Sequence, residues 1–254
     1  MSSIEEKRVY ADKSGERSVY LATDLGVLGV SVSDDLIGSF GIEHRCHARD
    51  LAWVDGLAVA TDEDVLFEGE PTDFGPAVAV GGAETPIAVG PEGRVARLEG
   101  EEWTDIGSLD DVRAANGDLL ATGEGVYRVG DGLDHVGLEG VHDVSVPGVP
   151  LAATDAGIYR LGNGWMHEFE GEFDRVSGIG SPGELSLGAT LAAGALSTYD
   201  GEWHERETPE PFVAVAVGEA VYGASSDGTL YVDAGDGWRS QALGVSGIRA
   251  MLVR

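Results

Sequence analysis

Lysine is almost absent from this sequence. Lys7 and Lys13 are the two lysines, and arginine supplies the other fourteen of the sixteen basic residues, against 45 acidic residues. Binding to nucleic acid phosphates needs a clustered basic face, and the sequence shows neither such a cluster nor an aromatic motif of the RNA-binding type. The formal net charge of −29 therefore argues against nucleic acid as a partner.

Cysteine, signal segments and nucleophile motifs are also scarce or missing. Cys46 is the single cysteine, so no intrachain disulfide can form. The stretch Met1–Tyr10 has no apolar core, and no apolar run is long enough to span a bilayer. We therefore expect a cytoplasmic monomer with no membrane partner. Neither Gly-x-Ser-x-Gly nor a glycine loop ending in Gly-Lys-Ser/Thr occurs, which leaves no nucleophile or phosphate-loop signature.

A sustained 3.6-residue apolar period is missing too, so helices should be nearly absent. What the chain has instead is one repeated stretch, Ala121–Val129, which returns nearly unchanged as Ala153–Leu161. In both copies two apolar runs flank a short turn that contains glycine, and this pattern predicts a β-hairpin. Weaker copies begin at Ala22, Ala60, Gly90, Leu191 and Ser226.

A further apolar run precedes each hairpin, and another strand follows it, often opened by tryptophan. Units of about four short strands repeated in this way predict an all-β fold, a seven-bladed β-propeller. We expect residues 1–254 to form a single domain, with residues 1–17 as a polar lead-in or an extra strand. The unit at residues 44–74 contains Pro71 and should have a short or irregular outer strand. The predicted innermost strands are centred on Leu51, Val78, Val112, Val144, Val176, Val215 and Ile248.

Two segments compete to close the ring. The C-terminal run Gly247–Leu252 resembles an innermost strand with no blade after it, and it can complete the first blade. Arg8–Ala11 is the rival, because it also precedes a hairpin. We favour closure by the C-terminus, which removes an open sheet edge.

The acidic residues are spread through every unit. A dispersed acidic coat with almost no lysine is typical of proteins from salt-in halophilic archaea, where multimolar salt screens the repulsion. The alternative is a field that steers a cation or a basic partner to the protein.

Charged residues head several of the predicted innermost strands, where they would surround one mouth of the central channel. Such a mouth is the default ligand site of a ring-shaped protein. The side chains can also form ion pairs and cap strand ends, with no ligand; a divalent cation or a cationic small molecule is the binding alternative. The candidates are Arg49, Asp50, Asp110, Asp111, His142, Asp143, Asp174 and Arg175.

Two weaker patterns suggest metal. His44, Cys46 and His47 are zinc-type ligands, but they crowd into four residues and lack a distant partner pair. Thr23-Asp24, Thr61-Asp62 and Thr154-Asp155 repeat in the hairpin turns and suggest calcium. Aspartates in turns also satisfy local backbone amides, and we favour that role. We therefore predict no cofactor, with a divalent cation as the open alternative.

The run Ala-Thr-Asp-x-Gly-Val/Ile-Tyr-Arg, followed by Asp/Asn-Gly-x-Trp, resembles the blades of sialidase-type, Asp-box-like propellers and of photosystem-II-assembly-factor-like propellers. Over the whole chain the sequence resembles a small haloarchaeal β-propeller family. The Asp-box is degraded here, as in Gly162–Trp165, and no sialidase arginine triad can be identified. The resemblance therefore implies a fold but no activity. We expect a non-enzymatic binding or scaffold propeller with a protein partner or small ligand on the channel face; the alternative is a hydrolase or lyase at the channel mouth.

Overall fold

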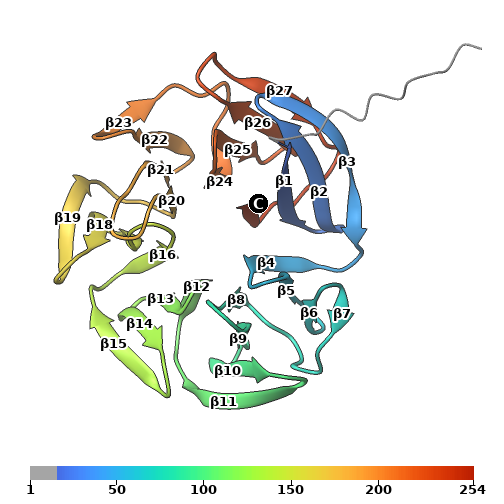
Figure 1. Ribbon diagram of the computed structural model, residues 1–254, viewed down its shortest axis with the longest axis vertical. Coiled ribbons are helices and arrows are strands. Elements are labelled where there is room, and N and C mark those ends of the chain that lie inside the picture. Colours follow the sequence, from blue (N-terminus) through green and yellow to red (C-terminus); the bar gives the residue numbers. More distant parts are fainter. Residues whose placement is uncertain (1–15) are drawn as a thin grey trace, which may run out of the picture.

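The computed structural model describes residues 16–254, in which 28 strands form seven four-stranded antiparallel sheets. The sheets stand like blades around a central axis, as Figure 1 shows, and the innermost strands contact one another in a closed ring. No helix occurs in the described part of the chain, and so none there has the length and apolar character of a membrane span. The predicted all-β, seven-bladed propeller is confirmed.

The blades are numbered here from the N-terminus, and their strands are given from the inside outward. Blade 1 contains β28 (Ala250–Val253), β1 (Glu16–Thr23), β2 (Gly26–Ser33) and β3 (Leu36–His44). Blade 2 contains β4 (Ala48–Trp53), β5 (Leu57–Thr61), β6 (Val65–Phe67) and β7 (Glu70–Pro71). Blade 3 contains β8 (Ala79–Gly81), β9 (Ile87–Val89), β10 (Arg94–Glu99) and β11 (Glu102–Ser108).

The remaining blades are more uniform. Blade 4 contains β12 (Val112–Asn116), β13 (Leu119–Thr122), β14 (Gly125–Val129) and β15 (Leu133–Gly137). Blade 5 contains β16 (Val141–Ser145), β17 (Leu151–Thr154), β18 (Gly157–Leu161) and β19 (Trp165–Glu170). Blade 6 contains β20 (Arg175–Ile179), β21 (Leu187–Ala192), β22 (Ala195–Tyr199) and β23 (Trp203–Arg206). Blade 7 contains β24 (Phe212–Val217), β25 (Val221–Ser225), β26 (Thr229–Asp233) and β27 (Arg239–Ala242).

The C-terminal strand closes the ring. Strand β28 pairs antiparallel with β1, with Val253 opposite Val19 and Ala250 opposite Ala22. Ser18 and Arg254 exchange backbone hydrogen bonds of 2.8 and 2.9 Å beyond the last pair. This confirms the predicted closure by the C-terminus, which leaves blade 1 without an open inner edge. The rival segment, Arg8–Ala11, lies outside the described residues.

A threonine hydroxyl stabilises the hairpin turn in blades 1, 2, 4 and 5. The buried Thr154 hydroxyl donates to the Gly157 carbonyl (2.8 Å) and accepts the backbone N–H groups of Ala156 (3.1 Å) and Gly157 (3.0 Å). The hydroxyls of Thr23, Thr61 and Thr122 make the same kind of contact. The following glycine is also required, because Gly157 has φ +155° and a Cβ there would lie 2.4 Å from the Phe169 carbonyl oxygen.

The core lies between blades. One cluster joins Ile87 and Val95 of blade 3 to Leu120 and Val129 of blade 4, all of them less than 5 % exposed. Full burial of one such side chain contributes about 1.5–3 kcal/mol.

Tryptophans near the start of the outermost strands tie blades 3, 5 and 7 to the blade before each of them. The indole Nε1–H of Trp165 donates to the Val136 carbonyl (2.9 Å), that of Trp103 to Thr72 (3.0 Å) and that of Trp238 to Glu207 (3.1 Å). The outer strand of blade 2, β7, spans only Glu70–Pro71, as Pro71 predicted.

Candidate functional site

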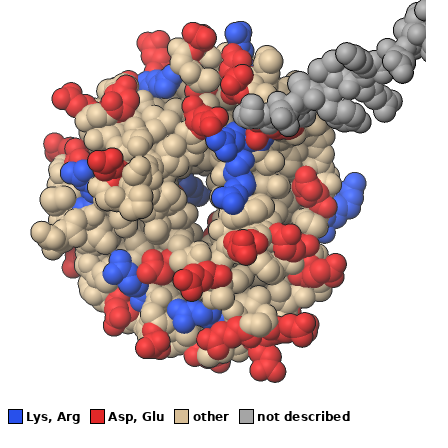
Figure 2. Space-filling model, in the orientation of Figure 1, with Lys and Arg blue, Asp and Glu red and all other residues tan. Residues whose placement is uncertain are grey.

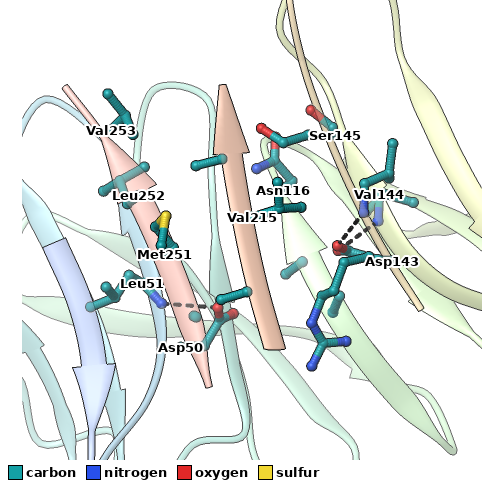
Figure 3. A pocket seen from close by; sticks show the side chains of 18 of the residues that line it. Asp50, Leu51, Asn116, Asp143, Val144, Ser145, Val215, Met251, Leu252 and Val253 are labelled. Atoms are coloured by element: carbon teal, nitrogen blue, oxygen red, sulfur yellow. Dashed lines mark hydrogen bonds between the residues drawn. The ribbon is translucent and has the colours of Figure 1, made fainter. Parts of the chain in front are cut away.

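The site is a cavity of about 400 Å³ at the axis of the ring. Figure 2 shows the central opening, with a basic side chain visible in its depth. Residues from the innermost strands or their entrances in all seven blades line it, and Figure 3 shows successive residues of β28, Met251, Leu252 and Val253, along one wall. This volume falls within the usual range for ligand sites, about 300–1,000 Å³.

A shared irregularity places charged side chains at one end of the cavity. Strands β4, β12, β16 and β24 each have a register shift against their neighbour, centred on Arg49, Arg113, His142 and Val213. A bulge leaves one residue unpaired and redirects its side chain. Arg249 stands at the corresponding position just before β28, while β20 has an unshifted ladder that begins at Arg175.

Four arginines, Arg49, Arg113, Arg175 and Arg249, thus line the cavity, and we call this set the arginine mouth. Sequence alignment on central apolar residues placed Asp110 and Asp111 at this level. In the structure the residues at this level of blade 4 lie three positions later in the sequence. Arg113 and Ala114 therefore occupy the level, and both aspartates precede β12. Asp111 nevertheless contacts the mouth, because its Oδ2 lies 2.6 Å from Arg113 Nη2.

Asp50 and Asp143 line the cavity, and each carboxylate forms hydrogen bonds that link two neighbouring blades. Asp50 accepts the backbone N–H of Leu51 through Oδ1 (2.9 Å) and that of Val80 in blade 3 through Oδ2 (3.0 Å). Asp143 likewise accepts the N–H of Val144 (2.8 Å) and that of Val176 in blade 6 (2.9 Å), as Figure 3 shows in part. The innermost strands of different blades do not pair, so these carboxylates satisfy N–H groups that would otherwise lack a partner.

Three uncharged side chains do the same work. Asn116 Oδ1 accepts the N–H of Val146, Ser145 Oγ that of Gly178, and Ser177 Oγ that of Val217, at 2.9, 3.0 and 3.1 Å. Many of the polar side chains that line the cavity therefore form hydrogen bonds between neighbouring blades.

Burial shifts the titration of both aspartates. Desolvation raises the pKa of Asp50 to about 7, although the N–H bonds from Val80 and Leu51 oppose it. Desolvation likewise raises the pKa of Asp143 to about 6, and here the nearby charge of Arg175 is the largest opposing effect. Near neutral pH the two carboxyls therefore bear less than their full negative charge.

The turn aspartates form ion pairs around the mouth. Asp24 binds Arg249 (2.7 Å) and lies 3.1 Å from His47, whose other ring nitrogen is 2.8 Å from Asp62. Asp62 also pairs with Arg49. These contacts join blades 1 and 2, and the hydrogen bond from Arg249 lowers the pKa of Asp24.

The predicted role of the turn aspartates as acceptors for their own turn amides is therefore not what the structure shows in these blades. The threonine hydroxyl takes that role, and the carboxylates face the mouth.

The contacts of His142 define its tautomer. Its Nε2 lies 2.6 Å from Asp155 Oδ1, and its Nδ1 lies 3.3 Å from Arg113 Nη1. Since a guanidinium only donates, Nδ1 accepts and Nε2–H donates to Asp155. His142 therefore links Arg113 to a turn carboxylate and leaves no metal-binding nitrogen free.

Arg175 differs from the other three arginines. Its Nη1 donates to the Asp174 carbonyl (3.0 Å), and within residues 16–254 it forms no ion pair. The Asp174 carboxylate instead accepts the N–H of Ala193 (3.0 Å). Arg175 therefore lines the cavity without a carboxylate at ion-pair distance, although its charge lies near enough to Asp143 to oppose the rise in the pKa of that carboxyl.

The sequence motif His44–His47 does not gather into one site. The His44 ring packs against Gly69, Cys46 lies partly buried beside the cluster that contains Leu51, and His47 faces two aspartates. Burial raises the pKa of the Cys46 thiol. In the described part of the chain no group of three or more His, Cys, Asp or Glu side chains is arranged to hold a metal ion.

Sequence reasoning missed Arg113 and Arg249 as members of the mouth. The signal for them is present as an apolar–basic pair, Val112-Arg113 and Ile248-Arg249, which matches Ala48-Arg49. Alignment on this pair finds the bulge; alignment on the apolar centre does not.

Fold and site together define a β-propeller with a charged channel mouth. The chain belongs to the HVO_0234-like beta-propeller family, whose model matches residues 3–254. This confirms the resemblance to a haloarchaeal propeller family. No curated protein matches the chain.

Solved structures of other propellers are similar in fold. A computationally designed protein, Ika8, has a TM-score of 0.60 at 14 % identity, over 93 % of this chain and 91 % of its own. YCF48 bound to D1 peptide has a TM-score of 0.58 at 16 % identity, over 82 % and 93 %. AztD from Citrobacter koseri has a TM-score of 0.57 at 11 % identity, over 92 % and 84 %. At these identities the similarity shows the fold alone.

Proposed function

We propose that this protein is a non-enzymatic binding propeller of a halophilic archaeon that recognises a protein partner or a small ligand through its channel mouth. The observation that supports this most is the cavity of about 400 Å³ whose charged end is held in place by the ring itself. A site built on packed strands is preorganised, so binding costs little ordering. The family's haloarchaeal name and the dispersed acidic coat support the source.

A protein partner is consistent with the neighbours. One similar propeller, YCF48, is described as bound to a peptide, and another is the WD40 domain of Neurospora crassa Pan2. Rings of this kind present their channel faces to other molecules without needing a catalytic motif, and fold alone assigns no activity.

The test is to plug the mouth without changing its charge. Ala114 lines the cavity and is partly exposed, so Ala114→Trp should fill it. Ala83 is exposed in the β8–β9 turn and does not line the cavity, so Ala83→Trp is the matched control. Met251→Trp is a second plug from another blade, for use if the first variant does not fold.

In affinity capture from a haloarchaeal lysate at about 2 M KCl, where charges are strongly screened, we expect one partner to be retained by wild type and by Ala83→Trp. Both plugged variants should lose it. Equal retention by a folded plugged variant would refute binding at the mouth.

A second candidate function, hydrolysis or elimination at the mouth, has one observation in its favour. Asp50 and Asp143 line the same cavity with pKa values of about 7 and 6, the range suited to general acid–base chemistry. Against it, each carboxyl already accepts two backbone N–H groups and supports the ring. Turnover on a panel of lactones, esters and glycosides that Asp143→Asn abolishes without loss of folding would favour the enzyme.

A further inference from the structure

The arginine mouth is unusual in a chain of this charge. The protein has 45 acidic residues and 16 basic ones, yet four arginines line one cavity together with only two carboxylates, those of Asp50 and Asp143. Both carboxylates direct their oxygens at backbone N–H groups in the wall. The cavity surface therefore offers donors to a ligand more than acceptors.

Three of the four arginines are held by the ring. Arg49, Arg113 and Arg249 pair with Asp62, Asp111 and Asp24, none of which lines the cavity. These pairs fix the guanidinium groups at the rim and cancel part of their charge.

Arg175 is the exception, because within residues 16–254 the one hydrogen bond of its guanidinium goes to a backbone carbonyl, that of Asp174. A guanidinium has five N–H donors in a planar fork that matches a carboxylate, which it binds through two parallel hydrogen bonds. Such a directional contact still contributes when salt screens the long-range attraction.

Apolar side chains continue the cavity beyond the charged end. Leu51, Val144, Val176, Val215 and Leu252 are among the lining residues, and Figure 3 shows Val215 and Leu252 further along the channel than Asp50. A ligand that suits both regions has an anionic head and an apolar body.

We propose that the arginine mouth is a binding site for an organic carboxylate, with the carboxylate on Arg175 and an apolar body along the channel. This rests on the proposed function, because it names the chemistry of the group that the mouth receives. That group can belong to a free small acid or to the C-terminal carboxylate of a peptide. Both share the same contact with Arg175.

The experiment measures binding by NMR chemical-shift titration of the full chain in concentrated KCl. The probes are hexanoate, its neutral analogue hexanamide, and a short alanine–leucine peptide with a free or an amidated C-terminus. We expect hexanoate to bind at least about tenfold more tightly than hexanamide, because a hydrogen bond to a charged group contributes more than the roughly 1.4 kcal/mol that corresponds to a factor of ten. If the ratio of affinities for the free and the amidated peptide exceeds the ratio for hexanoate and hexanamide, the C-terminus of a peptide is the source of the carboxylate.

Arg175→Gln should abolish the preference for the acid. Arg239→Gln is the matched control, because Arg239 lies on the outer strand β27, pairs with Asp35 and is far more exposed. It should leave the titration unchanged. Lysine at position 175 keeps the charge but loses the fork, so Arg175→Lys should bind more weakly than wild type.

Equal binding of hexanoate and hexanamide, or an acid preference that survives Arg175→Gln, would overturn the proposal. Neither result decides the outcome of the plug experiment. If Ala114→Trp abolishes partner binding but Arg175→Gln does not, the binding function stands and only the carboxylate proposal is refuted. If the plugged variants still bind both the partner and hexanoate, the proposed function and the carboxylate proposal are both refuted.

Discussion

Asp50 provides a quantitative test of how the ring is fastened. Asp50→Asn keeps the shape of the side chain and one oxygen, so one of the two N–H groups, from Leu51 or Val80, loses its acceptor. A buried donor left unsatisfied costs about 1–3 kcal/mol. At low pH, where the wild-type carboxyl is neutral in the folded protein, the variant should be less stable by about that amount.

The cost should shrink as the pH rises. The folded-state pKa of Asp50 is raised from 3.8 to about 7, so its contribution to stability is fully present below pH 3.8 and is lost as pH rises through 7. Asparagine does not titrate. The full shift corresponds to about 4 kcal/mol at about 1.4 kcal/mol per pKa unit, of which roughly 2–3 kcal/mol falls between about pH 5 and 8.

The assay is urea unfolding followed by tryptophan fluorescence in concentrated KCl, at several pH values. From about pH 5 to pH 8, the wild type should lose about 2–3 kcal/mol of unfolding free energy relative to Asp50→Asn. Asp134→Asn is the control, because Asp134 is exposed on β15. If the difference in unfolding free energy stays constant with pH, or if the wild type gains stability relative to the variant, Asp50 is not a desolvated carboxyl that links two blades.

Three further predictions concern the same ring. Asp143→Asn should show a pH dependence of the same sign but about half the size over that range, because desolvation raises its pKa only to about 6; an equal or larger change would contradict the ordering. Deletion of residues 250–254 removes β28 and exposes the inner edge of β1, so the cooperative thermal transition should disappear, and a melt like that of the full chain would count against closure by this strand. The melting temperature should rise steadily with KCl, because a net charge of −29 repels itself less when the screening length falls from about 10 Å at 0.1 M to about 3 Å at 1 M; a melt independent of salt would argue against halophilic adaptation.

Local patterns were sufficient to predict the fold. Each hairpin is specified within about ten residues by two apolar runs and a turn, and the copies at Ala121 and Ala153 differ little, so the repeat, the strand order and the blade count follow from the sequence. Closure by β28 was predictable for the same reason, since Gly247–Leu252 has the pattern of an innermost strand without a hairpin after it.

The site was less predictable, because it depends on register and on contacts between blades. A bulge at Arg113 displaces the charged level of blade 4 from where apolar alignment puts it. The acceptor role of Asp50 toward Val80 joins residues thirty positions apart across unpaired strands, and no local pattern encodes that contact. The turn threonines were visible in the sequence, but the contact of Asp155 with His142 joins the hairpin turn of blade 5 to β16 and is not encoded by the local pattern.

The most direct test of the central claim is a crystal structure of the wild-type protein grown with hexanoate at high KCl. We expect density for the carboxylate within hydrogen-bonding distance of both terminal nitrogens of Arg175, with the hydrocarbon beside Val215 and Leu252. Hexanoate bound elsewhere, with the Arg175 guanidinium turned away from the channel, would contradict the claim that the mouth is a carboxylate site.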